Sequence, residues 1–107
     1  MKTAPTTSDS ILITGGRILT PFDELPGADV LIRGARIAAV GRGLARKAPK
    51  DALRIDARGC CVAPGFIDLH TQGGCDHDVW DGTREALQGW SRCNARHGAT
   101  SYLITTG

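Results

Sequence analysis

Short runs of β-branched and aliphatic residues, separated by glycine, proline and aspartate, make up most of the first 63 positions. Runs of this length between turn residues are typical of β-strands joined by tight connections. Residues 21–27, PFDELPG, contain two prolines and a glycine and predict a loop. Strands are predicted at residues 11–14, 17–20, 29–33, 36–40, 53–57 and 60–63.

Turn residues predict how these strands pair. Gly34 can take the first central position of a type II′ turn, so strands 29–33 and 36–40 are expected to form an antiparallel hairpin. Arg58-Gly59 is expected to turn the chain so that 60–63 pairs back. Everything up to about residue 63 therefore predicts a small antiparallel sheet unit.

The hydrophobic period changes after residue 64. A strand is predicted for residues 65–69, GFIDL, and a glycine- and aspartate-rich loop for 71–82. Apolar residues then recur at three- and four-residue steps from Thr83 to His97, which predicts a helix. Residues 100–106, TSYLITT, predict a second strand. Strand, helix and strand in this order predict a βαβ unit with parallel strands.

The limits of the predicted helix lie at Asp81, which can cap its start, and at Gly98, which suits its end. The second strand stops just before Gly107, the last residue. A parallel pair of strands needs neighbouring strands and covering helices. We therefore interpret the sequence as the amino-terminal piece of a larger protein.

Composition and charge exclude several classes of function. Apolar residues make up 41% and charged residues 22% of 107 residues, and the formal net charge is +2. This charge is too small to indicate a nucleic-acid or membrane partner. No apolar stretch is long enough to span a bilayer, and residues 1–10, MKTAPTTSDS, indicate a flexible tail rather than a signal peptide. A cytoplasmic location is expected.

The four cysteines, at positions 60, 61, 75 and 93, are expected to be free thiols in a reducing compartment. They contain no CxxC pair, which argues against a structural zinc site. Packing is the expected role of Cys60 and Cys61.

Polar residues alternate along the strand that ends near residue 70. Asp68, His70 and Gln72 share one face, and Ile67, Leu69 and Thr71 share the other, where they can pack under the helix. His70 lies at the carboxyl end of the strand, where enzymes with parallel sheets place their sites.

His70 can bind a metal ion through its imidazole, and Gln72 can supply a weaker carboxamide contact. Gly73 and Gly74 would let the backbone approach a bound substrate closely. A single histidine beside a loop is more often a hydrogen-bonded structural residue, and this alternative stays open. His77, between two aspartates, is expected to be solvated rather than a ligand.

Several stretches resemble the amino-terminal part of the amidohydrolase superfamily: ADVLIRGARIAAVG, RIDARGCCVAPGFIDLH and the glycine pair after it. The stretches PGFIDLHTQGG and ARHGATSYLITT are most similar to its N-acetylglucosamine-6-phosphate deacetylases. The resemblance implies an α/β fold with a β-rich amino-terminal part. Residues 11–63 would belong to a partial β-sandwich, and residues 64–107 to the first βαβ unit of an incomplete TIM-like (β/α) barrel.

The resemblance also implies chemistry. A divalent metal, zinc or a similar ion, would polarise the acetamide of a phosphorylated amino sugar. Many members of the superfamily carry His-x-His at this strand end, whereas this chain has His70-Thr71-Gln72. The catalytic carboxylate and the principal metal ligands of the family lie on later strands. The site is thus incomplete, and the 107-residue chain alone is expected to be inactive.

Two alternatives stay open. One is another amidohydrolase, dihydroorotase-like or hydantoinase-like, although such enzymes usually keep both histidines. The other is a non-catalytic fragment that pairs with a second chain. A homodimer is one assembly left open for the longer parent protein.

Overall fold

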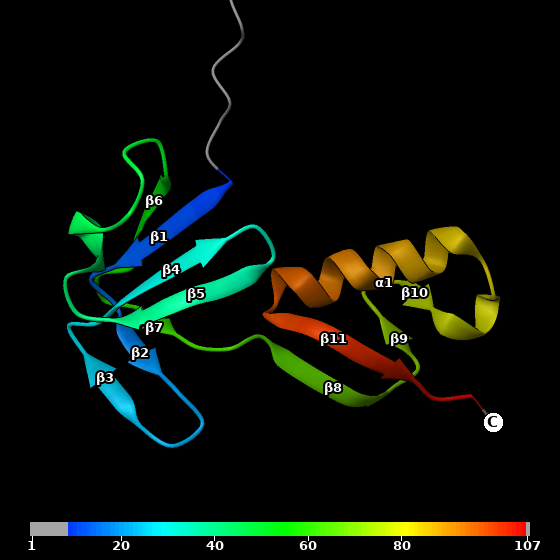
Figure 1. Cartoon of the computed structure of the whole chain (residues 1–107). Helices are drawn as coiled ribbons and strands as arrows, with labels where there is room; N and C mark the ends of the chain where they lie inside the picture. The colour runs from blue at the N-terminus through cyan, green and yellow to red at the C-terminus, as the bar shows by residue number, and fades with distance from the viewer. Residues whose placement is uncertain (1–8, 107) are drawn as a thin grey trace, which may run out of the picture. The chain divides into compact units, whose positions relative to one another are not determined.

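A computed structural model describes residues 9–106, which divide into two compact units, residues 9–64 and 65–106 (Figure 1). Most of the predicted tail, residues 1–8, lies outside the described residues, and Ser10 already belongs to a strand. Within residues 9–106, no helix has the length and apolar character needed to cross a membrane.

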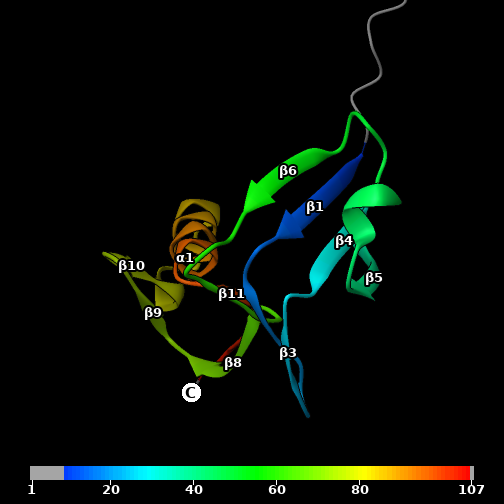
Figure 2. The same cartoon turned by 90° about the vertical axis from the view of Figure 1, so that its left-hand side faces the viewer.

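The first unit contains two sheets of short strands. The larger sheet has the order β5-β4-β1-β6, whose strands lie side by side in Figure 2. Its strands are β1 (Ser10–Thr14), β4 (Asp29–Arg33), β5 (Arg36–Gly41) and β6 (Leu53–Asp56). The smaller sheet has the order β3-β2-β7 and consists of β2 (Arg17–Leu19), β3 (Glu24–Pro26) and β7 (Cys61–Val62).

The predicted hairpin is confirmed. β4 and β5 pair antiparallel, and their last pair before the turn is Arg33–Arg36. Gly34 in the turn has φ 56°, an angle that is unfavourable for residues with a side chain. The prediction of a wholly antiparallel unit is wrong, because β6 pairs parallel with β1. β7 likewise pairs parallel with β2 rather than folding back on β6.

The turn after β6 explains the difference. The backbone N–H of Ala57 donates to the Thr14 carbonyl, at 2.8 Å, and that of Arg17 donates to the Cys60 carbonyl, at 3.0 Å. These bonds lead the chain from β6 towards β2. The predicted loop 21–27 also contains a strand that was not expected, β3, which pairs antiparallel with β2.

Two small apolar clusters form the core of this unit. Leu12 is fully buried and packs with Leu31 of the neighbouring strand and with Leu44 of η1 (Leu44–Arg46). A second cluster comprises Ile18, Ala28 and Val30. Since aromatic residues make up only 5% of the chain, aliphatic side chains supply this core.

Asp56 carries a pH-dependent contact at the turn. Its carboxylate accepts hydrogen bonds from the side chain and from the backbone N–H of Arg58, and these bonds lower the pKa of Asp56. Because the pKa of Asp56 is lower in the folded state than in the unfolded state, its ionised carboxylate stabilises the fold at pH values above the unfolded-state pKa. This contribution disappears as the pH falls through the folded-state pKa. Both groups are exposed, so the effect on stability is small.

We therefore expect Arg58→Ala to raise the pKa of Asp56 towards the ordinary range of a carboxyl group. Titration of the Asp56 side chain by NMR measures this shift directly. Arg54→Ala removes a neighbouring guanidinium and serves as the control, which should leave the pKa of Asp56 unchanged. Equal pKa values in the two variants would show that the contact is unimportant.

The second unit contains the predicted strand–helix–strand arrangement. β8 and β11 pair parallel, and α1 lies between them in the sequence (Figure 1). The predicted loop 71–82 contains a short antiparallel hairpin instead. The elements are β8 (Phe66–Thr71), β9 (Gly73–Gly74), β10 (His77–Asp78), η2 (Val79–Asp81), α1 (Arg84–Arg96) and β11 (Ala99–Ile104).

The start of α1 differs from the prediction. Thr83, not Asp81, is the N-cap residue, and its Oγ1 accepts a hydrogen bond from the backbone N–H of Ala86 at 3.1 Å. Asp81 belongs to η2, and Gly82, with φ 62°, separates the two helices. Gly98, with φ 91°, follows the helix end as predicted.

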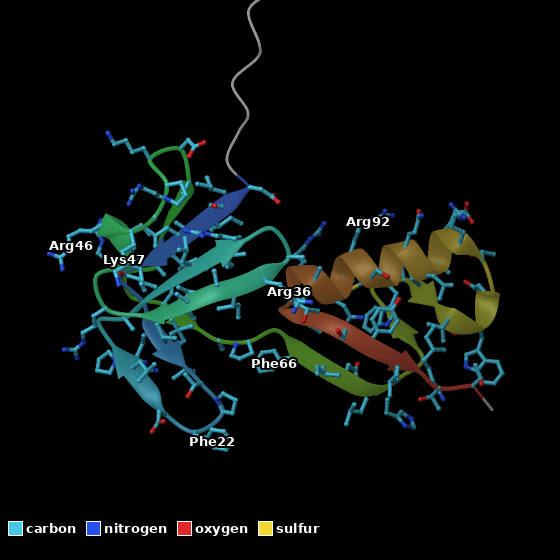
Figure 3. The ribbon with its side chains drawn as sticks, in the orientation of Figure 1. Phe22, Arg36, Arg46, Lys47, Phe66 and Arg92 are labelled. Atoms are coloured by element: carbon cyan, nitrogen blue, oxygen red, sulfur yellow. A yellow bond between two sulfur atoms is a disulfide. The ribbon has the colours of Figure 1, made fainter. Side chains whose placement is uncertain are left out.

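The helix packs on β9, β10 and β11. Ile67 and Leu69 of β8 are 64% and 71% exposed, so the prediction that they pack under the helix is wrong. The reason is that α1 lies against the strand that follows it rather than against β8. Phe66, at the start of β8, is also exposed, as its side chain shows in Figure 3.

Candidate functional site

The end of β8 is held by hydrogen bonds around a buried threonine. Thr71 is 6% exposed, and its carbonyl accepts a hydrogen bond from the backbone N–H of Thr105 at 2.8 Å. Its Oγ1 accepts another from the N–H of Gly73, at 3.3 Å. The carbonyl of Gln72 accepts from the N–H of Val79, at 3.0 Å. Residues 71–73 therefore have a defined backbone position.

The three polar residues of the predicted face have different surroundings. Asp68 is half-buried, and its Oδ1 accepts a hydrogen bond from the backbone N–H of His70 at 3.1 Å. His70 and Gln72 are exposed. Their side chains are thus accessible to a ligand.

A cavity of about 420 Å³ lies beside the end of β8. It is lined by Gln72, Gly73, Gly74, Asp76, His77, Asp78 and Asp81. Three of the four predicted site residues, which are consecutive in the sequence, thus line this cavity, and His70 does not. Three carboxylates around the cavity favour a cation over an anion there.

The two glycines have a packing role. Gly73 has φ 129°, and a Cβ on it would overlap the His77 carbonyl of β10. A Cβ on Gly74 would lie 2.6 Å from the Trp90 ring. Both positions therefore require glycine for the packing of the loop itself, and contact with a substrate stays a prediction.

Metal ligation by the described residues alone is not supported. Across residues 9–106, no group of three or more His, Cys, Asp or Glu side chains is arranged to hold a metal ion. His70 and Gln72 provide one good and one weak donor, whereas a zinc site in a protein uses three or four. The two residues alone therefore supply too few donors for a tight metal site.

The structure also contains contacts that the sequence pattern did not reveal. The His77 ring lies where a side chain on Gly89 would be, so His77 packs on α1 while staying partly exposed. Trp90 contacts Tyr102 edge to face, with ring centroids 6.4 Å apart, and the hydroxyls of Ser91 and Tyr102 are 2.8 Å apart. Gly89 was the available signal, because glycine inside a helix often marks a close approach.

The cysteines differ from the prediction as well. Cys75 and Cys93 form a disulfide, so the prediction of four thiols is wrong. The hairpin β9–β10 folds back on α1 and brings their Cα atoms to 6.4 Å, although the residues are 18 positions apart. Cys60 and Cys61 are free but exposed, so core packing does not explain them.

The sequence is similar to those of several curated hydrolases. A dihydroorotase of Syntrophotalea carbinolica is 44% identical over 85 residues, which are 74% of this chain and 19% of that protein. A deacetylase of Agrobacterium fabrum is 40% identical over 80 residues, which are 74% of this chain and 17% of that protein. The chain thus spans about a fifth of the length of the curated relatives it matches. No protein-family model matches it.

The fold is similar to parts of several solved hydrolase structures. N-acetylglucosamine-6-phosphate deacetylase from Pasteurella multocida superposes with a TM-score of 0.78 at 27% identity, over 89% of this chain and 25% of that one. A D-hydantoinase superposes with a TM-score of 0.53 at 41% identity, over 60% of this chain and 13% of that one. On these similarities the chain belongs to the amidohydrolase superfamily of hydrolases, whose members are typically metal-dependent.

Proposed function

We propose that this chain is the amino-terminal part of a metal-dependent deacetylase that removes the acetyl group of N-acetylglucosamine 6-phosphate or a close amino-sugar phosphate. The observation that carries the proposal is the closeness of the superposition. The deacetylase from Pasteurella multocida covers 89% of the chain with a TM-score of 0.78, whereas a prolidase that covers the same 89% superposes with a TM-score of 0.63. The deacetylase match is also too long to be confined to either unit.

The residue at position 72 supports the same choice. Dihydroorotase-like and hydantoinase-like members of the superfamily usually have His-x-His at this strand end, and this chain has His70-Thr71-Gln72. A carboxamide oxygen binds a divalent metal more weakly than an imidazole nitrogen does. The dihydroorotase of Syntrophotalea carbinolica has the higher sequence identity, 44%, so dihydroorotase activity is the second candidate.

In this proposal His70 and Gln72 are two of the metal donors, and Gly73 and Gly74 lie beside the substrate. The bound metal would supply polarisation of the acetamide carbonyl. Because the described residues supply too few donors for a tight metal site, no chemical step is assigned to them. The (β/α) barrel to which β8, α1 and β11 would belong is part of the same proposal.

Activity of the natural protein that carries these residues decides between the candidates. Acetate release from N-acetylglucosamine 6-phosphate is expected to exceed hydrolysis of dihydroorotate at least about tenfold in kcat/KM. The purified 107-residue chain is expected to hydrolyse neither. If the natural protein hydrolysed dihydroorotate faster, the deacetylase proposal would be wrong and dihydroorotase activity would take its place. If it hydrolysed neither substrate, the result would favour a non-catalytic protein.

A separate prediction concerns the metal donors. Titration of the 107-residue chain with Ni²⁺ is expected to broaden the NMR signals of His70 and Gln72 first, at millimolar rather than micromolar metal. Nickel is chosen because it is paramagnetic and because it suits imidazole donors better than carboxylate donors. His70→Ala should abolish the broadening at Gln72, whereas His97→Ala, at the far end of α1, should not. Broadening confined to the aspartates at 76, 78 and 81 would refute the assignment.

A further inference from the structure

The disulfide joins the loop beside the candidate site to the helix. Cys75 follows Gly74 directly in the loop between β9 and β10, and Cys93 lies in the last turns of α1. Cys75 is exposed and Cys93 is half-buried, so one of the two sulfur-bearing residues is open to solvent. We propose that this disulfide is a reversible redox latch that holds the glycine loop, residues 72–78, against α1.

The loop backbone contains two successive residues in an unfavourable conformation that contacts with α1 must maintain. Cys75 has φ 51° and Asp76 has φ 62°, and they are the two non-glycine residues with positive φ among residues 9–106. The left-handed region is unfavourable for residues with a Cβ, so two in succession persist only where surrounding contacts impose them. The bond from Cys75 to α1 is such a contact.

Besides the disulfide, two ring contacts join the loop to α1. The Trp90 ring lies over Gly74, and the His77 ring lies over Gly89. The hairpin itself has only the pairs Gly73–Asp78 and Gly74–His77. With so short a ladder, the loop is expected to open when the disulfide is removed.

The surroundings of the disulfide suit thiol exchange. A cavity of about 210 Å³ beside it is lined by Cys75, His77, Gly89, Arg92, Cys93, Arg96 and His97. Arg92 projects from α1 in Figure 3. The Nδ1 atom of His97 lies 3.7 Å from Cys93 Sγ and closer, at 2.9 Å, to the carbonyl oxygen of Cys93. The two guanidinium groups that line the cavity therefore supply the positive charge that favours a thiolate on Cys93 when the bond breaks.

The reductant that the latch requires is a dithiol. One thiolate of the dithiol attacks Sγ of the exposed Cys75, forms a mixed disulfide and releases Cys93 as a thiolate. The second thiol of the dithiol then attacks the reductant's other sulfur, which is bonded to Cys75 in the mixed disulfide, and releases Cys75 as a thiolate. Two electrons pass to the cysteine pair, the dithiol becomes a disulfide, and the two cysteine thiolates take up the two protons that the dithiol loses.

Hydrogen exchange of the 107-residue chain tests the latch with dithiothreitol as the probe. After reduction, the amides of residues 73–79 are expected to exchange at least about tenfold faster, while those of β1 and β4 keep their rates. Tryptic mapping follows the bond itself, because cleavage after Arg58, Arg84, Arg92 and Arg96 leaves peptides 59–84 and 93–96 linked only when the disulfide is present. After removal of the dithiothreitol, oxidised glutathione should restore both the link and the slow exchange.

Variants separate the latch from a general effect of the reductant. Cys75→Ser and Cys93→Ser should each show fast loop exchange without dithiothreitol, and the double variant Cys60→Ser/Cys61→Ser should respond like the unmodified chain. Equal loop exchange before and after reduction would overturn the proposal, as would a disulfide that millimolar dithiothreitol reduces only after unfolding. None of these measurements depends on the proposed deacetylase activity.

Discussion

Replacing Leu12 by alanine is expected to lower the free energy of unfolding of residues 9–64 by about 3 kcal/mol, one of the two largest effects predicted here. Leu12 is the one large side chain with no exposed surface among residues 9–106. It packs between Leu31 and Leu44, so truncation removes buried methyl groups and leaves a cavity that β1 and β4, held in register by hydrogen bonds, cannot close. Urea titration followed by the amide NMR signals of β1 and β4 measures the change.

Leu53→Ala is the matched control for this variant. Leu53 pairs with Ile11 across β1 and β6, but it is 60% exposed. The same chemical change at this position should cost less than about 1 kcal/mol. Equal losses at Leu12 and Leu53 would mean that the cluster around Leu12 does not form the core of this unit.

Replacing Gly73 by alanine is expected to lower the free energy of unfolding of residues 65–106 by a similar amount, again about 3 kcal/mol. Two causes add. The φ of 129° at Gly73 is rarely adopted by residues with a side chain, and the new Cβ would overlap the backbone of β10, including Cα of Asp78 at 3.0 Å. Both tryptophans, Trp80 and Trp90, lie in this unit, so urea unfolding followed by tryptophan fluorescence reports it.

Gly27→Ala separates these two causes. Gly27 also has positive φ, 70°, but a Cβ there would have nothing within 4 Å. Only the conformational cost remains, about 1 kcal/mol, and it falls on the other unit. NMR signals of residues 9–64 follow this variant. If Gly73→Ala cost no more than Gly27→Ala, the close approach of β9 to β10 would not be a constraint on the loop.

The local elements were predictable because their causes lie within a few residues. Gly34 between two alternating runs is enough for the hairpin of β4 and β5, and the recurrence of apolar residues in α1 is enough for its length. The N-cap was missed because Asp81 and Thr83 are both good caps, and the choice depended on Gly82 ending η2.

Long-range pairings were predicted less well. The Arg58-Gly59 turn suggested that residues 60–63 return to the preceding strand, yet β7 pairs with β2, more than forty positions earlier in the sequence. A turn residue fixes the local direction of the chain but not the strand that it meets. The same limit applies to Ile67 and Leu69, whose apolar character suggested burial and whose exposure depends on where α1 packs.

By itself, the sequence determined most of the strand and helix segments, the parallel βαβ order of the second unit, and the superfamily. These follow from residue type and period, which act over short distances along the chain. Only the tertiary structure decided that Cys75 meets Cys93, that His77 docks on Gly89, and that Gln72 shares its cavity with three aspartates rather than with His70. Those contacts depend on how the β9–β10 hairpin folds onto α1, which packing between distant segments determines and no local pattern encodes.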